Sequence, residues 1–278
     1  MKQIRGIFPD DSGGKFKLII AKAASGAEGE GTITTLLLAV HSCVQEGAKV
    51  ISIAMGNECY SKIEEIYFDR LYGKGVLIVA AAGDEGDDIY SYPATLPSVI
   101  AVASSDDSRA RGSSSSNDQI ELTAPGSNIV STISNNKYSS WTGSGMAAAH
   151  VSAVAGLLWM HFPSCTNVQI RNVLAKTALD IGVTGCDDIF GHGLVQAKAA
   201  YELLAQGTCG GDIGANTPVG GCSQLNNPLL SNSCSDANDC NDGDPCTMDV
   251  CTSNICNQYN MMKIMMCRSY AMVSQSYL

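Results

Sequence analysis

The sequence predicts an α/β fold in which a parallel sheet carries helices on both faces. Short apolar runs rich in β-branched residues alternate with longer segments whose apolar residues keep helical spacing. This alternation is typical of parallel sheets, because their strands are joined by crossover helices. The chain has 278 residues, of which 45% are hydrophobic, so it is long enough for one large domain and a small appended module.

Four apolar runs before residue 104 are expected to form buried strands. They are residues 16–22, 49–54, 76–82 and 98–103. The first helix is expected at residues 32–46, where Thr32 is placed to cap its beginning and Gly47 to end it. A second helix is expected at residues 62–71.

The pattern changes after residue 104. Residues 113–118 are a polar loop, and two short extended segments at 120–126 and 128–133 flank a Pro-Gly turn. An apolar helix is expected from Met146 to about His161. Two amphipathic helices complete the large domain, at residues 166–179 and 194–205.

The charge and the length of the apolar runs exclude two classes of partner. The chain has 17 Lys and Arg residues against 27 Asp and Glu residues, which gives a net charge of -10. A negative protein is repelled by phosphate backbones, so no nucleic-acid or anionic-membrane partner is expected. The longest apolar stretches, such as residues 151–160, are shorter than the roughly 20 residues that a membrane-spanning helix needs.

The cysteines indicate an oxidising compartment. Eight of the 12 cysteines lie between Cys209 and Cys267, as in a disulfide framework. Zinc is disfavoured because this region lacks CxxC pairs and histidines. Residues 1–8 lack the sustained apolar region of a signal peptide, so the sequence predicts that a secreted protein has lost its beginning.

A change of composition at Thr208 predicts the domain boundaries. The large domain is expected at residues 1–205, a linker at 206–233, and a Cys-rich module with a tail at 234–278. Cys165 and Cys186 flank a helix and a loop and are expected to form a disulfide. Cys209 and Cys222 are expected to close one loop, and Cys43 and Cys59 are either free or partners of each other. The six remaining cysteines allow 15 pairings: Cys234, Cys240, Cys246, Cys251, Cys256 and Cys267.

The run Gly-Ser-Gly-Met-Ala-Ala-Ala-His at residues 143–150 resembles the Gly-Thr-Ser-Met-Ala-x-Pro-His signature of the subtilisin-like serine proteases. In that family the third residue of the signature is the nucleophile, at the start of a helix. Four more segments resemble family landmarks in the same order, at residues 75–86, 91–102, 123–126 and 191–195. The resemblance covers roughly residues 1–205, and it implies a subtilisin-like sheet that lacks its first strand.

The resemblance also implies that the catalytic residues are not intact. The nucleophile position is Gly145, which has no side chain to attack a carbonyl. Ser144 does not substitute, because one step along a helix turns a side chain by about 100°. The family's aspartate and histidine come from segments before the strand that residues 16–22 match; Asp11 imitates that aspartate in composition, but no apolar strand precedes it.

The four histidines are expected to have local structural roles, and the oxyanion position is altered as well. The histidines are His41, His150, His161 and His192. Where the family has an asparagine that donates to the developing oxyanion, this chain has Asp84, and an ionised carboxylate only accepts. Loss of one such donor lowers the rate by about 10²- to 10³-fold, a value measured in this same family.

Two segments resemble the walls of the family's substrate cleft. Ala54, Met55 and Gly56 resemble a Ser-Leu-Gly segment that pairs with the substrate backbone. The wall of the pocket for the residue before the scissile bond is matched by three residues, Ala81, Ala82 and Gly83. A peptide or protein segment is therefore the expected partner, bound as an added strand; the alternative is that these residues are only strand ends kept by descent.

Three hypotheses follow. The first is a subtilisin-like endopeptidase homologue that is inactive as written. The second is a secreted pseudo-protease that binds a peptide or another partner. The third is an incomplete gene model of an active extracellular serine endopeptidase. No metal is expected in the large domain, because the family's calcium loop would lie before it; carboxylates at residues 240–251 make calcium the alternative cofactor.

Overall fold

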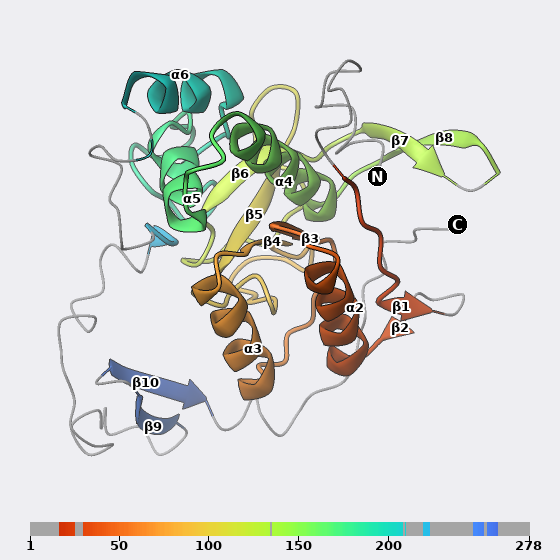
Figure 1. The fold of residues 1–278 in the computed structure, drawn as a ribbon, viewed down its shortest axis with the longest axis vertical. Coiled ribbons are helices and arrows are strands. Elements are labelled where there is room, and N and C mark those ends of the chain that lie inside the picture. The colour runs from red at the N-terminus through yellow and green to blue at the C-terminus, as the bar shows by residue number, and fades with distance from the viewer. Residues whose placement is uncertain are drawn as a thin grey trace.

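A four-stranded parallel sheet forms the centre of the molecule (Figure 1). The computed structural model describes residues 17–25, 30–133, 135–207, 209, 219–222, 247–252 and 255–260. The strands follow chain order, β3 (Val50–Ile53), β4 (Leu77–Ala81), β5 (Val99–Ser105) and β6 (Leu122–Pro125). In the register Val50 pairs with Leu77, Ile78 with Val99, and Val102 with Leu122. Strands β3, β4 and β5 were predicted from their apolar runs, and β6 lies in the short extended segment predicted at residues 120–126.

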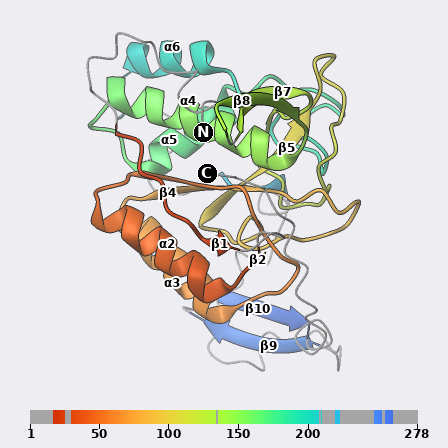
Figure 2. The ribbon, with the colours of Figure 1, turned by 90° about the vertical axis from the view of Figure 1, so that its right-hand side faces the viewer.

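Helices cover both faces of the sheet, which confirms the predicted fold class (Figures 1 and 2). One face carries α2 (Ile33–Gln45) and α3 (Lys62–Gly73). The other face carries α4 (Ser144–His161), α5 (Asn167–Lys176) and α6 (Ala197–Gly207). Alternate residues of the buried strand β4 supply the two cores: Leu77 and Val79 pack towards α4, and Ile78 and Ala80 towards α2 and α3.

Local signals fix where the helices begin and end. Thr32 caps α2 in a reciprocal arrangement with Thr35, and Gly47 follows the helix with a φ of 86°. A second capping box begins α5, where the Thr166 hydroxyl accepts a hydrogen bond from the Gln169 amide. None of the helices in the described part of the chain is long and apolar enough to cross a membrane.

Three two-stranded elements accompany the sheet. The antiparallel strands β7 (Ile129–Ile133) and β8 (Lys137–Trp141) form a hairpin that projects beyond it (Figure 1). Strand β8 was not predicted, although Asn135 and Asn136 gave a signal: their φ values of 59° and 56° are ones that asparagine tolerates in turns. The other two pairs are short, β1 (Ala24–Ser25) with β2 (Glu30–Gly31), and β9 (Thr247–Thr252) with β10 (Ile255–Asn260).

The strand predicted at residues 16–22 is wrong for the described residues 17–22. No strand pairing involves this segment, and the side chain of Ile20 is 57% exposed. The segment lies instead along α2, where Lys17 pairs with Glu46 at 2.7 Å. A run of β-branched residues needs a neighbouring strand to pair with, and the described sheet places none beside this segment.

A fully buried ion pair joins α5 to the sheet. Arg171 and Glu121 are each 1% exposed, and the guanidinium donates from Nε to both carboxylate oxygens, at 2.8 and 3.0 Å. Its Nη1 and Nη2 atoms donate to the carbonyls of Pro97 and Val99, at 2.7 and 3.2 Å. Burial alone would lower the pKa of Arg171, but the Glu121 carboxylate raises it above its ordinary value. Arg171 thereby connects α5 to the beginnings of β5 and β6.

Two disulfides correct the predicted pairing. Cys165 is bonded to Cys209 and Cys186 to Cys222, so neither the Cys165–Cys186 bridge nor the Cys209–Cys222 bridge exists. Each of the two cysteines pairs instead with a cysteine beyond α6, at Cα–Cα distances of 5.0 Å for Cys165–Cys209 and 5.4 Å for Cys186–Cys222, which are ordinary for disulfides. Pairing is set by these tertiary distances, which spacing along the sequence does not give.

The remaining described cysteines settle one further alternative. Cys43 is free and Cys59 is disulfide-bonded, so they are not partners of each other. Burial raises the pKa of the Cys43 thiol. The six cysteines of the predicted Cys-rich module have no described side chains, so their pairing stays open.

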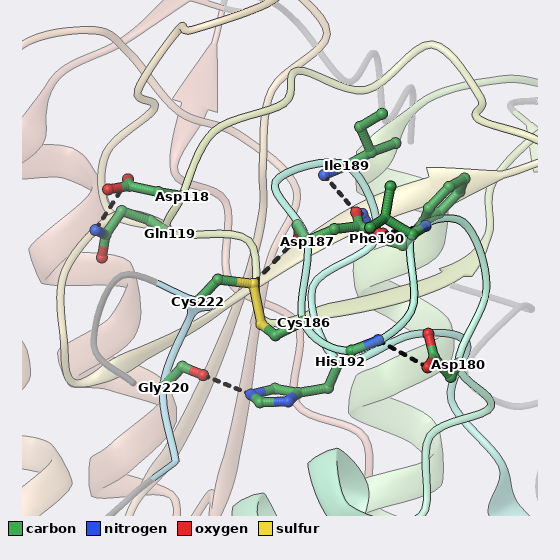
Figure 3. Close-up of a disulfide and its surroundings, with 12 residues drawn as sticks. Asp118, Gln119, Asp180, Cys186, Asp187, Ile189, Phe190, His192, Gly220 and Cys222 are labelled. Atoms are coloured by element: carbon green, nitrogen blue, oxygen red, sulfur yellow. Dashed lines mark hydrogen bonds between the residues drawn. A yellow bond between two sulfur atoms is a disulfide. The ribbon is translucent and has the colours of Figure 1, made fainter. Parts of the chain in front are cut away.

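Figure 3 shows how the Cys186–Cys222 bridge attaches residues 219–222 to the large domain. His192 Nε2 lies 2.9 Å from the Gly220 carbonyl oxygen, and the Val219 amide donates to Asn172 Oδ1 at 3.0 Å. Gly221 lies so close to Gln119 that an added Cβ would be 2.7 Å from its backbone. These four residues therefore pack on the domain, although they lie inside the linker predicted at 206–233.

We expect the Arg171→Met variant to lose about 3–5 kcal/mol of unfolding free energy, because Glu121 would stay buried without a partner. The double variant Arg171→Met/Glu121→Leu should recover most of that loss, since it removes both charges. Urea unfolding at neutral pH measures both variants. A double variant as unstable as the single one would show that the carbonyl contacts, and not the ion pair, carry the effect.

Candidate active site

The carboxyl ends of β3 and β4 meet the beginning of α4 at one edge of the sheet. Gly145 is the second residue of α4, and a Cβ built on it would lie 3.1 Å from the Cβ of Ala54, just after β3. The Gly83 amide, just after β4, donates to Ser144 Oγ at 3.1 Å. The structure thus brings together the three segments that the sequence analysis assigned to the nucleophile position and to the two cleft walls.

The Asp84 carboxylate binds the first turn of α4. The Ser144 amide donates to both oxygens of Asp84, at 3.0 and 3.2 Å, and the Ser144 hydroxyl donates to Oδ2 at 3.2 Å. The residue before the helix is Gly143, which has no side chain to cap it. Asp84 therefore caps α4 from a distant part of the sequence, where its negative charge also interacts favourably with the helix dipole.

A loop with four consecutive serines, residues 113–116, forms hydrogen bonds with the segment that contains Asp84. Ser113 donates from its hydroxyl to Asp84 Oδ1 at 2.8 Å. Two residues later, the Ser115 amide donates to the Gly83 carbonyl at 2.8 Å, and the Ser115 hydroxyl accepts from the Glu85 amide at 3.1 Å. The sequence analysis described residues 113–118 only as a polar loop. The signal was the run of four serines, which is long for an ordinary turn.

Ser144 is not placed to act as a nucleophile. Its side chain is 1% exposed, and its hydroxyl is engaged both by the Gly83 amide and by the Asp84 carboxylate. The hydroxyl therefore points towards the end of β4 and not into open space beside the helix. This agrees with the prediction that a shift of one residue turns the side chain away from the nucleophile position.

Three of the four histidines have local contacts, as predicted. In α4, His150 Nδ1 lies 2.9 Å from the Met146 carbonyl oxygen one turn earlier. At the end of the same helix, His161 stacks edge to face on Tyr201, and His192 contacts Gly220. His41 is an exposed residue of α2. None of these contacts places an imidazole beside residue 145 as a general base.

The two segments predicted as cleft walls lie at the same edge of the sheet. Ala54, Met55 and Gly56 are half-buried, and among the described residues they pair with no strand. In the second predicted segment Ala81 and Ala82 are buried and Gly83 is half-buried. Met55 reaches β2, where a Cβ added to Gly31 would lie 3.3 Å from its Cε atom.

No group of three His, Cys, Asp or Glu side chains in the described part of the chain could hold a metal ion. The carboxylates at residues 240–251 lie outside the described side chains, so calcium there stays a prediction.

The parallel sheet, the helices on both of its faces and the glycine-rich start of α4 at the carboxyl ends of β3 and β4 form the arrangement that the sequence predicted, with Gly145 at the position expected for the nucleophile. The family model Peptidase_S8, described as the subtilase family, matches residues 12–193. The chain therefore belongs to the subtilase family.

The chain is also similar to curated proteases. The minor extracellular protease Epr of Bacillus subtilis is 35% identical over 183 residues, which are 65% of this chain and 28% of that protein. Subtilisin Savinase of Lederbergia lenta is 35% identical over 176 residues, which are 63% of this chain and 64% of that protein. The chain thus spans less than two thirds of the length of these relatives.

Solved structures show the same fold. The psychrophilic subtilisin-like protease Apa1 of Pseudoalteromonas sp. AS-11 has a TM-score of 0.62 at 21% identity, covering 66% of this chain and 76% of that one. A mutant of the protease domain of PatA has a TM-score of 0.57 at 26% identity, covering 63% and 66%.

We expect Asp84→Ala to lower the unfolding free energy by about 1–3 kcal/mol, because it leaves the buried Ser144 amide without an acceptor. Asp84→Asn keeps an acceptor and loses only the charge, so about 0.3–1 kcal/mol is expected. Thermal and urea unfolding measure both, with the exposed Asp107→Ala as the control. Increased stability of Asp84→Ala would show that the carboxylate strains the helix start and does not cap it.

Proposed function

We propose that this subtilase homologue, as written, does not hydrolyse peptide bonds. Two features together support the proposal. Gly145 occupies the position expected for the nucleophile, and the Asp84 carboxylate accepts a hydrogen bond from the Ser144 amide next to it. A serine peptidase needs a hydroxyl to attack the carbonyl, and it needs donors for the oxyanion. Here the first is missing, and an acceptor stands where the family places a donor.

The magnitude of the loss supports this proposal. Removal of the whole catalytic triad in subtilisin leaves about 10³- to 10⁴-fold catalysis over water, a value from this same family and not from this chain. That remainder comes from the oxyanion hole and from binding. With Asp84 in place of a donor, even less of it would be left.

The catalytic proposal is tested on the purified full chain with a serine-directed fluorophosphonate and with casein. We expect no covalent adduct and no cleavage. The Gly145→Ser variant should also stay unlabelled, because a hydroxyl without a neighbouring base is a weak nucleophile. Subtilisin Savinase, a relative with 35% identity, is the positive control. Casein cleavage that the fluorophosphonate blocks would refute the proposal.

We further propose that the cleft binds an extended peptide. Support comes from residues 54–56, which continue β3 past its pairing with β4 and lie beside Gly145. Backbone groups of such a segment can pair with a peptide as an added strand, with no chemistry involved. The disulfides and the extracellular relative Epr support an extracellular location for this binding.

Peptide binding is measured by fluorescence anisotropy with a labelled casein digest. We expect saturable binding that Ala54→Glu weakens at least tenfold, because the added charge would lie next to Gly145. The matched control is Val183→Glu, which places the same charge on a loop residue that is 71% exposed. Absence of saturable binding to the folded wild-type chain would refute the cleft proposal.

The alternative is that these residues are part of a longer, active extracellular endopeptidase. The lengths of the relatives favour it, since the chain spans 28% of Epr and 64% of Savinase. Sequencing of the transcript decides between the two proposals. A serine codon at position 145, with an upstream His-Gly-Thr-His segment, would favour the active enzyme; a glycine codon would favour the inactive homologue.

A further inference from the structure

A buried carboxyl group without a partner lies under α3. Glu64 is 0% exposed, and neither of its oxygens has a hydrogen-bond partner in the described part of the chain. It shares the buried stripe of α3 with Phe68 and Leu71, which follow at the i+4 and i+7 positions. An acidic side chain therefore occupies a position of the helix that otherwise belongs to the apolar core.

The surroundings of this stripe are apolar. Phe68 and Leu71 belong to the core cluster that α2, β3 and β4 also form, with Leu36 and Ile78 among its members. Neither β3 nor β4 contains a titratable residue. The titratable residues of α2 are His41, which is exposed, and Cys43, a thiol.

The charged groups of α3 and its flanks are engaged elsewhere or do not act on Glu64. Lys62 pairs with Glu65 at 2.8 Å, and Lys17 pairs with Glu46 after the end of α2. Asp69 and Arg70 are the other charged residues of α3. Burial is the only cause that raises the pKa of Glu64, to about 7, so no neighbouring charge offsets the loss of water.

We propose that Glu64 makes the layer of α2 and α3 a pH-sensitive element of the fold. With a neutral carboxyl the two helices pack closed over the sheet. When the carboxyl ionises, the charge needs water, and α3 opens locally to supply it. The layer of α2 and α3 is therefore more stable at mildly acidic pH than at alkaline pH.

The sign of the effect follows from proton binding. In the unfolded chain the carboxyl has a pKa of 4.5, and in the folded chain its pKa is raised to about 7. Between these values the folded state binds more protons, so stability falls as the pH rises through this window. The difference corresponds to an opening equilibrium that increases on the order of 10²-fold between pH 5 and pH 8.

The test is amide hydrogen exchange of α3 in the full chain at pH 5 and pH 8, corrected for intrinsic exchange rates. We expect the opening equilibrium of α3 to increase on the order of 10²-fold at pH 8 in the wild type. Glu64→Gln should remove this pH dependence, and the exposed Glu58→Gln should keep it. Wild-type protection that is equal at both values of pH, or dependence that survives Glu64→Gln, would overturn the proposal.

A second measurement needs no variant. The carboxyl carbon of Glu64, followed by NMR in the wild-type chain, should titrate near pH 7. A titration near pH 4.5 would show that the carboxyl reaches water in the native state, and it would overturn the proposal. Glu64→Leu, which keeps the apolar stripe without a polar atom, replaces Glu64→Gln if the amide variant does not fold.

Discussion

Helix α4 packs directly on the sheet, and this contact sets the position of the rest of the site. Its inward residues Ala147, Ala148, Val151 and Ala155 are all fully buried, and the helix contacts all four strands of the sheet. Small side chains let the helix approach the strands closely. Because α4 begins at the edge where β3 and β4 end, Gly145 lies against Ala54 whatever chemistry its position can support. The geometry at the start of α4 is thus maintained by core packing, independently of the chemistry at residue 145.

Three ionisable groups that are buried or half-buried differ in the partners that replace their lost hydration. The Arg171 guanidinium satisfies Glu121 and two carbonyls, so it works as an internal cross-link. Asp84 is satisfied by the start of α4 and by a serine hydroxyl, which uses a carboxylate as a structural cap. Glu64 has neither kind of partner among the described residues. A carboxyl group therefore stabilises the start of α4 at Asp84, whereas at Glu64 a carboxyl group is buried under α3 without a hydrogen-bond partner among the described residues.

The elements of the fold that depend on apolar periodicity were predicted from the sequence. Prediction failed for elements whose structure depends on contacts between distant segments. Strands β3 to β5 and helices α2 to α6 follow from local patterns, and β6 was predicted only as a short extended segment. Residues 17–22, in contrast, have the composition of a strand and no strand beside them. Strand β8 was missed because its polar residues give no apolar signal. In the site, Asp84 was predicted as a lost donor, but its capping of Ser144, 60 residues away in sequence, needed the folded chain. Disulfide pairing likewise depends on distances that spacing does not give.

The two described disulfides are interleaved along the chain. Cys186 lies inside the loop that Cys165 and Cys209 close, and Cys222 lies outside it. If the peptide chain is cleaved between Cys186 and Cys209, both disulfides still join the two fragments. If it is cleaved between Cys165 and Cys186 or between Cys209 and Cys222, one disulfide joins them. A protease that hydrolyses a single peptide bond between Cys165 and Cys222 therefore leaves the two pieces covalently joined.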